Sequence, residues 1–149
     1  MEKPSLYLAG PITGLSWDQC VGWRKQVTQE LGEFIDCFSP LRHKDYLNQV
    51  IEIKDVHEEH IMSSQRAIFA RDMFDVSRCG GLFVNFLGAK RISIGTVMEI
   101  AVGWQLRKPI IVIMEDNNIH QHSMLREASP FLVKTLDDGI DVARRLFLR

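Results

Sequence analysis

Short apolar segments alternate with stretches of helical periodicity along this 149-residue chain, and this alternation constrains the fold more than any other feature. The segments with the length and composition of buried strands are residues 5–9, 35–38, 81–86, 109–113 and 131–134. Apolar residues recur at helical spacing in residues 16–31, 63–77, 94–106, 123–128 and 137–148. Strands separated by helices pair in parallel, because a parallel neighbour needs a long crossover connection. The pattern therefore predicts an α/β fold with a five-stranded parallel sheet covered by helices on both faces.

The composition is that of an ordinary globular protein, with 46% hydrophobic and 25% charged residues. A length of 149 residues suits a single domain over residues 1–149. A formal net charge of −1 favours neither nucleic acid nor a membrane surface as a partner, and no apolar run has the length of a membrane span. The three cysteines are odd in number and lack metal-ligand spacing, which indicates reduced thiols and a cytoplasmic location.

Glu99 is the single charged residue of the apolar helix predicted for residues 94–106. Its neighbours on the same helical face, three and four positions away, are small or apolar: Gly95, Thr96, Val102 and Gly103. Small side chains around one acid leave room for a ligand to reach it. Acids are rarely buried without a partner or a task. The pattern favours a working carboxylate, and the alternative is a structural one that caps a loop or pairs with a buried arginine.

The turns after the predicted strands are the expected place for a ligand, because open α/β sheets bind ligands beyond the carboxyl ends of their strands. These turns are residues 10–14, 39–46, 87–96 and 115–123. The first, Gly-Pro-Ile-Thr-Gly, can direct its backbone N–H groups towards a ligand. Its glycines match neither the Rossmann fingerprint nor the P-loop. Residues 41–59 form a long irregular connection, and such loops tend to be functional.

Other side chains give weaker signals. Asp72 lies with Asp75 on the helix before the third predicted strand, where most acidic residues are solvated. The five histidines lack the spacing of zinc ligands, so we predict neither a metal nor another cofactor. Ser93 and Ser123 lack the sequence context of a catalytic serine, which argues against a serine hydrolase.

Three motifs in register resemble the nucleoside 2-deoxyribosyltransferase family, which includes the 2′-deoxynucleoside 5′-phosphate N-hydrolases. They are YLAGPITG at residues 7–14, Arg-Asp at residues 71–72 and SIGTVMEIAVGWQLRKPIIVI at residues 93–113. The resemblance runs from residue 7 to about residue 127. It implies a flavodoxin-like three-layer sandwich with a five-stranded parallel sheet, which agrees with the pattern of strands and helices.

The resemblance also implies roles for particular residues. Glu99 matches the nucleophile, Asp72 the acid that contacts the base, and Tyr7 the residue that holds the nucleophile by a hydrogen bond. It implies a homo-oligomer in which a neighbouring subunit lends a residue near the sugar 5′ position, and Ser123 falls there. The implied partners are a nucleoside or nucleotide and a free nucleobase. A second acid that usually follows the helix of Asp72 is replaced by Gly80, so the preferred base stays open.

The remaining residues expected to bind substrate lie on the predicted ligand edge of the sheet. They are Gly10, Pro11, Ile12, Thr13, Arg42, Ser93, Gly95 and Thr96. The free N–H groups of the helix start at Gly95, together with the Ser93 hydroxyl, can donate to an oxygen of a phosphate.

Two positions separate the branches of the family. Transferases that use free nucleosides commonly carry an Asp where this chain has Ser93, and an Asn where it has Ser123. Serines at both places resemble the N-hydrolase branch, in which they bind a 5′-phosphate. That branch also uses an Arg in the first loop, where this chain has Thr13. Arg42 or Arg91 could take its place.

The function that follows from the resemblance is cleavage of the N-glycosidic bond of 2′-deoxynucleosides or their 5′-monophosphates through a covalent deoxyribosyl–Glu99 intermediate. A carboxylate can stabilise the oxocarbenium-like transition state and then capture C1′. The sugar then passes to another nucleobase in a transferase, or to water in an N-hydrolase. A non-catalytic nucleotide-binding protein on the same fold is the alternative from a different class.

Overall fold

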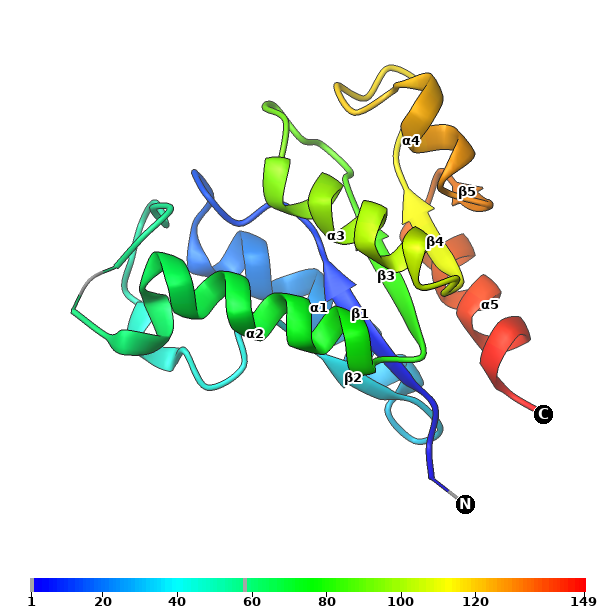
Figure 1. Ribbon diagram of the computed structural model, residues 1–149, viewed down its shortest axis with the longest axis horizontal. Coiled ribbons are helices and arrows are strands. Elements are labelled where there is room, and N and C mark those ends of the chain that lie inside the picture. The colour runs from blue at the N-terminus through cyan, green and yellow to red at the C-terminus, as the bar shows by residue number, and fades with distance from the viewer. Residues whose placement is uncertain (1, 58) are drawn as a thin grey trace.

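The structure, a computed structural model, describes residues 2–57 and 59–149. Its centre is a parallel five-stranded sheet with the strand order β2-β1-β3-β4-β5 (Figure 1). The strands are β1 (Ser5–Ala9), β2 (Asp36–Phe38), β3 (Gly81–Asn85), β4 (Ile110–Ile113) and β5 (Phe131–Val133). The helices are α1 (Trp17–Leu31), α2 (Gln65–Arg78), α3 (Ile94–Gln105), α4 (Ser123–Glu127) and α5 (Leu136–Phe147), with the 3-10 turns η1 (Asp45–Leu47) and η2 (Ile61–Ser63). The predicted flavodoxin-like α/β fold is confirmed, since this strand order is that of flavodoxin-like sheets.

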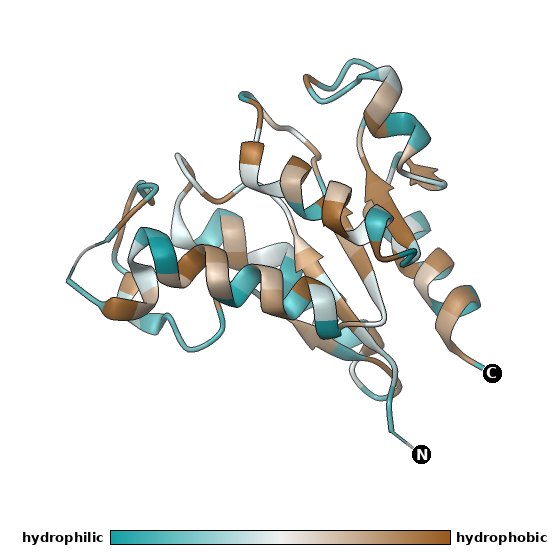
Figure 2. Cartoon of the chain, viewed as in Figure 1, coloured by the Kyte–Doolittle hydropathy of each residue, from teal (hydrophilic) through white to brown (hydrophobic). Residues whose placement is uncertain are grey.

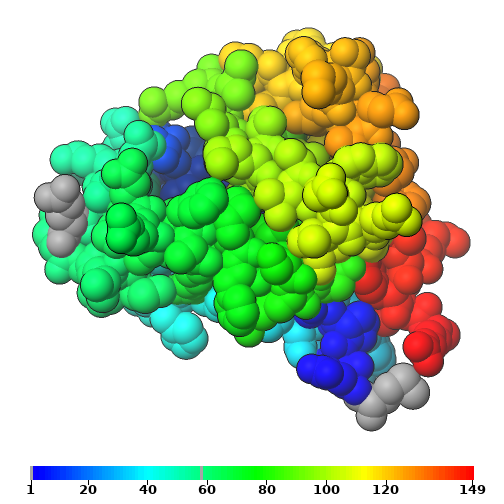
Figure 3. Space-filling model, viewed as in Figure 1, coloured from blue at the N-terminus to red at the C-terminus, as the bar shows by residue number. Residues whose placement is uncertain are grey.

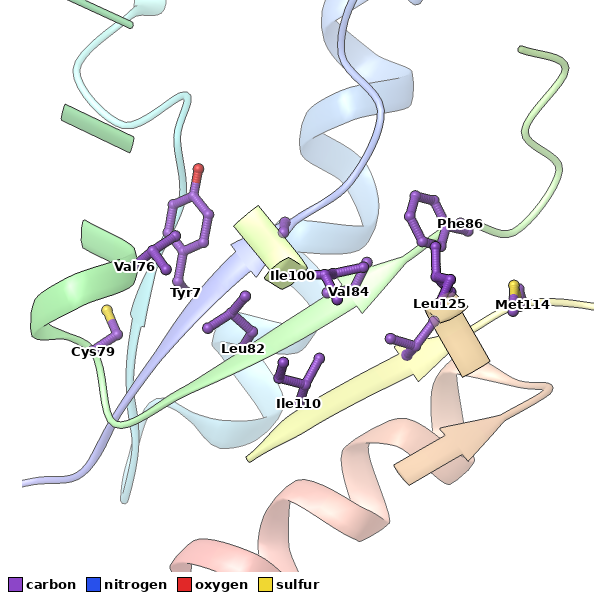
Figure 4. Packing of buried hydrophobic residues seen from close by; sticks show 12 residues of the cluster. Tyr7, Val76, Cys79, Leu82, Val84, Phe86, Ile100, Ile110, Met114 and Leu125 are labelled. Carbon is purple, nitrogen blue, oxygen red and sulfur yellow. The ribbon is translucent and has the colours of Figure 1, made fainter. Parts of the chain in front are cut away.

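The alternation of side chains along each strand divides the core into two layers. Leu6 and Leu8 of β1 pack with residues of α1 and α5 on one face of the sheet. Tyr7 and Ala9 point to the other face, where α2, α3 and α4 cover them. Figure 4 shows this second layer, and Figure 2 shows the hydrophobic central strands between the helices. Both faces are covered because parallel strands are apolar on both sides.

The first and last residues of the helices and strands agree to within two residues with the ranges expected from the sequence. Local signals explain this agreement. Ser16 caps α1 in a reciprocal pair with Gln19, and Ser64 and Thr135 accept hydrogen bonds at the starts of α2 and α5. Helices begin where a short polar side chain satisfies the free N–H groups of the first turn.

The long connection after β2 folds back on the loop after β1. The Gly14 N–H donates to the Ile53 carbonyl at 2.7 Å, and the Ile53 N–H donates to the Leu15 carbonyl at 2.8 Å. Ile53 is buried with Cys20 and Leu41 in a small apolar cluster. The segment predicted as irregular, residues 41–59, thus forms a packed wall beside the first loop, with residue 58 outside the described part of the chain.

In the part of the chain that the structure describes, no helix combines the length and the hydrophobicity needed to cross a membrane.

Candidate active site

A pocket of about 410 Å³ lies at the carboxyl ends of β1 and β2, between the long connection, α2 and the start of α3. Figure 3 shows it as a hollow in which blue N-terminal atoms lie below teal and yellow-green walls. The lining residues are Gly10, Pro11, Ile12, Thr13, Pro40, Leu41, Lys44, Leu47, Ile53, Lys54, Asp55, His57, Ser63, Ile68, Asp72, Arg91, Ile92, Ser93, Ile94, Gly95, Thr96 and Glu99. The pocket is therefore where the order of strands and helices predicted a ligand site.

Three oxygen-bearing side chains converge below this pocket from three different elements. Tyr7 rises from β1 with its hydroxyl directed out of the apolar cluster (Figure 4). Asp72 comes from α2, and Glu99, only 7% exposed, comes from the second turn of α3. Tyr7 Oη, Asp72 Oδ1 and Glu99 Oε2 are all buried without a hydrogen-bond partner among the described residues. Buried polar atoms are nearly always paired, so three unpaired ones at one pocket mark a site built for a ligand.

Burial shifts the acid–base behaviour of both carboxyls. The pKa of Glu99 is raised to about 8, first by burial and second by the neighbouring Asp72. The Tyr7 hydroxyl lowers the pKa of Glu99, although this pair does not reach regular hydrogen-bond geometry. The pKa of Asp72 is raised to about 6 by burial, against the lowering effect of the Lys44 ammonium. Near neutral pH the two carboxyls therefore hold one proton between them, mainly on Glu99.

Two buried cations support this pair, and the sequence reasoning missed both. Arg24 of α1 is 2% exposed and donates to the carbonyls of Leu8 at 3.1 Å, Cys20 at 2.6 Å and Gly10 at 3.2 Å. Its charge lowers the pKa of Glu99 and of Asp72. The available signal was an arginine on the buried stripe of an amphipathic helix, four residues after Cys20.

Lys44 is the second of these cations. It lines the pocket and is 5% exposed, and burial lowers its pKa while Asp72 raises it. Lys44 lies in a charged loop stretch, and nothing in its sequence context separates it from the solvated residues around it.

The start of α3 presents donors to the same pocket. Ser93 is the N-cap residue, but its hydroxyl bonds to the Thr96 hydroxyl at 2.8 Å and does not cap the helix. The first-turn N–H groups near Gly95 therefore stay available, as expected from the sequence. Arg91 also lines the pocket and packs over Gly14, whose positive φ of 86° suits glycine.

Arg42 is not brought to the pocket. Its guanidinium makes two hydrogen bonds with the carboxylate of Asp75, at 2.5 and 2.9 Å, and Asp75 is fully buried. Arg78 completes the group with a contact of 2.9 Å to Asp75. A bidentate arginine with a buried carboxylate is a structural anchor between the loop after β2 and α2. Of the two arginines considered for a phosphate, the pocket contains Arg91 and not Arg42.

Ser123 is also outside this pocket, because it begins α4 on the surface of the chain. Its expected role in another subunit's site stays a prediction. Among the described residues, no group of three or more His, Cys, Asp or Glu side chains is arranged to hold a metal ion.

Replacing Glu99 with glutamine should stabilise the protein at alkaline pH. The folded pKa of about 8 exceeds the ordinary value of 4.5, so the folded state loses stability as pH rises from about 4.5 to 8 and the unfolded chain ionises first. The Glu99→Gln protein lacks this loss. We expect its melting temperature to match wild type at pH 5 and to exceed it by several degrees at pH 9, measured by calorimetry. An equal difference at both pH values would contradict the raised pKa.

The family model of the nucleoside 2-deoxyribosyltransferases matches residues 6–139. No curated protein matches the chain. Among solved structures, the chain is similar to 2-deoxyribosyltransferase from the psychrotolerant bacterium Bacillus psychrosaccharolyticus, with a TM-score of 0.64 and 21% identity over 92% of this chain and 90% of that one. It is also similar to Clostridium botulinum CMP N-glycosidase, with a TM-score of 0.59 and 12% identity over 95% and 98% of the two chains.

A third similar structure is the molybdenum cofactor binding protein from the phototrophic bacterium Rippkaea orientalis, with a TM-score of 0.60 and 13% identity over 98% of each chain. At these identities the structural likeness establishes the fold. The family match establishes more than the fold, because it covers residues 6–139. This range contains all five strands except the first residue of β1, and every residue that lines the pocket of Glu99 and Asp72. The chain belongs to the nucleoside 2-deoxyribosyltransferase family.

Proposed function

We propose that this protein cleaves the N-glycosidic bond of 2′-deoxynucleosides or their 5′-monophosphates and transfers the sugar to another nucleobase. The observation that carries this proposal is the convergence of three buried, unpaired oxygens at one pocket, those of Tyr7, Asp72 and Glu99. A structural Glu99 would have a partner of its own. The family match supports nucleosides and nucleobases as the class of substrate.

In the proposed reaction, the C1′–N bond breaks and its electron pair leaves with the base. Asp72 gives its proton to the departing base, while a carboxylate oxygen of Glu99 forms a bond to C1′. The incoming base then attacks C1′, releases Glu99 and returns a proton to Asp72. The reactive form needs Glu99 ionised and Asp72 protonated. The shared proton must therefore move from Glu99 to Asp72 when substrate binds, which a base acceptor beside Asp72 and positive charge at C1′ both favour.

Lys44 and Arg24 fit the charges of this reaction. The ammonium of Lys44 lies near enough to Asp72 to lower its pKa, so it makes Asp72 a stronger acid towards the departing base and stabilises the carboxylate left after the proton transfer. Arg24 favours the ionised form of Glu99 from below the first loop. Charges fixed inside a buried site act strongly on a transition state because little water screens them.

Two alternatives remain distinct from transfer. Water can replace the second base, which makes the protein a 2′-deoxynucleoside 5′-monophosphate N-hydrolase. Arg91, Lys54 and the free donors at the start of α3 line the pocket together, and this cluster suits a phosphate. The second alternative is non-catalytic nucleotide binding, for which the likeness to a cofactor-binding protein is the supporting observation.

A chromatographic assay of base release tests the proposal. The protein is incubated with deoxynucleosides and with deoxynucleoside 5′-monophosphates, each with and without a second base. Exchange that needs the second base supports transfer, and release without it supports hydrolysis. Tight binding of a substrate, with no base released from any of them, would leave non-catalytic nucleotide binding as the function.

Ser93→Asp should shift substrate preference from 5′-monophosphates to unphosphorylated deoxynucleosides. A carboxylate at the start of α3 accepts from a 5′-hydroxyl but repels a phosphate dianion, at a cost of several kcal/mol for charges about 4 Å apart. The measurement is the ratio of kcat/KM for the two substrates in both proteins. A wild type that turns over deoxynucleosides and ignores monophosphates would show that Ser93 does not bind phosphate.

Ser123 should complete the pocket of a second copy of the chain. An apolar hollow of about 660 Å³ between α3 and α4, with Trp104 52% and Met124 76% exposed, offers a surface for that contact. Glu99→Gln and Ser123→Ala should each lower activity, and mixing the two proteins should restore part of it if subunits share sites. Sedimentation that finds an active monomer at assay concentration would contradict this arrangement.

A further inference from the structure

The loop between β4 and α4 places the imidazole of His120 beside the start of α3. His120 is 3% exposed, and its ring stacks on Phe86 with centroids 3.8 Å apart and planes 15° from parallel. Its Nε2 accepts a hydrogen bond from the backbone N–H of Ser93 at 2.9 Å. The catalytic steps proposed above do not use this residue, and no sequence motif contains it.

The hydrogen bonds of His120 determine its protonation. Because Nε2 accepts from an N–H group, it carries no proton, and the proton of the neutral ring is on Nδ1. Nδ1 lies 3.0 Å from Asn118 Oδ1, which also accepts from the backbone N–H of His120 at 2.9 Å. The Asn118 amide is oriented from its other end, where Nδ2 donates to the Phe86 carbonyl at 2.7 Å. One consistent chain of donors and acceptors therefore runs from the end of β3 to Ser93.

The start of α3 needs such an anchor because it is not capped. The Ser93 hydroxyl bonds to the Thr96 side chain and leaves the first-turn N–H groups free. An uncapped helix end can bind a ligand, but it also frays more easily. The contact from His120 fixes the backbone of this end without using the donors that face the pocket.

We propose that His120 is a positioning residue for the pocket: as the neutral Nδ1–H tautomer it ties the start of α3 to the end of β3, and so holds the Ser93 hydroxyl and the first-turn N–H groups in place for the 5′ substituent of the substrate. The identity of that substituent rests on the proposed function. The tether itself rests on the contacts of Asn118, His120 and Ser93.

Protonation breaks this tether, because the charged ring carries a proton on Nε2 and can no longer accept. Burial lowers the pKa of His120 from its ordinary value, and the Glu115 carboxylate on the same loop acts in the opposite direction. The neutral form therefore predominates at neutral pH. The contact with Ser93, and the stability it contributes, are lost as pH falls through the lowered pKa.

Two measurements on the intact protein test the tether directly. The ¹⁵N NMR shifts of the His120 ring at pH 7.5 should show a protonated Nδ1 and an unprotonated Nε2. In His120→Phe, which keeps a ring against Phe86 but has no acceptor, the Ser93 amide should exchange with solvent at least tenfold faster. His122→Phe is the matched control, since it removes an imidazole that accepts from the Met124 N–H at 3.2 Å; the Ser93 amide should exchange there as in wild type.

A substrate comparison tests the consequence for the pocket. In His120→Phe, kcat/KM should fall about tenfold for the substrate with its 5′ substituent, and change less than twofold for the 2′,5′-dideoxy analogue. Equal losses for both substrates would overturn the positioning role. An Nε2–H tautomer, a charged ring at pH 7.5 or an unchanged Ser93 amide would overturn the tether. If no substrate releases base, the proposed function fails, but the ¹⁵N shifts of the His120 ring and the exchange rate of the Ser93 amide still test the tether. If His120→Phe does not fold, the ¹⁵N shifts of the wild-type ring test the tether alone.

Discussion

Replacing Glu99 with glutamine should lower the rate of base release by at least about 10³-fold, as removal of a nucleophile does in other enzymes. The amide matches the shape of the carboxyl and keeps the contacts of α3, but it cannot form the ester to C1′ or stabilise its positive charge. In the proposed reaction, no other group can substitute for Glu99. Glu99 reaches the pocket from α3, whereas Asp72 comes from α2, and the proposed reaction uses Asp72 as the acid for the departing base.

Single-turnover measurement of released base, at saturating enzyme, gives the rate of this step. Glu33→Gln is the control, because it makes the same change at an exposed position after α1 and should leave the rate unchanged. Mass spectrometry of the wild type quenched during turnover should find one deoxyribosyl group on the peptide that contains Glu99. A Glu99→Gln protein with a rate near wild type would exclude the covalent mechanism.

Replacing Arg42 with methionine should lower the free energy of unfolding by about 2–3 kcal/mol, or roughly 6–10 °C in melting temperature for a chain of this size. The change removes the bidentate partner of Asp75, a carboxylate with no exposed surface. Such a charge cannot return to water without opening the contact between α2 and the loop after β2. Arg78 remains beside Asp75 and limits the loss.

The double variant Arg42→Met with Asp75→Leu should recover most of this stability, since apolar residues can replace a buried ion pair at little cost. Arg145→Met serves as the control: it breaks an exposed pair with Asp141 and should leave the melting temperature nearly unchanged. Denaturation by urea, followed by circular dichroism, gives the free energies of unfolding, and thermal denaturation gives the melting temperatures. If Arg42→Met is as stable as wild type while losing monophosphate binding, Arg42 would belong to the substrate site after all.

The fold could be predicted from the sequence because its signals are local. The alternation of strand and helix periods, the capping residues Ser16 and Ser64, and the turn at residues 10–14 each depend on neighbours within a few positions. Parallel pairing and coverage of both sheet faces then follow from general rules of connection. The same local reasoning selected Glu99, because an acid among small residues on one helical face is visible in a short window.

The family resemblance named Tyr7, Asp72 and Glu99 from the sequence, but the burial and surroundings of these residues were decided only by the tertiary structure. Tyr7, Asp72 and Glu99 lie 65 and 27 residues apart along the chain, and their meeting below one pocket depends on the strand order and on how α2 and α3 pack. Burial, which raises the pKa of both carboxyls, is a property of that packing.

Long-range contacts likewise decided which charged or polar residues serve the pocket. Arg42, expected near a phosphate, is held by a buried Asp75 that sequence could not distinguish from a solvated one. Arg24 and Lys44, which were not singled out, lie buried beside the carboxyls. His120 contacts Ser93 across 27 positions. The sequence by itself therefore determined the architecture and the helix that carries the acid, because both follow from short-range patterns, whereas the partners of that acid follow from distances between segments that only the folded chain brings together.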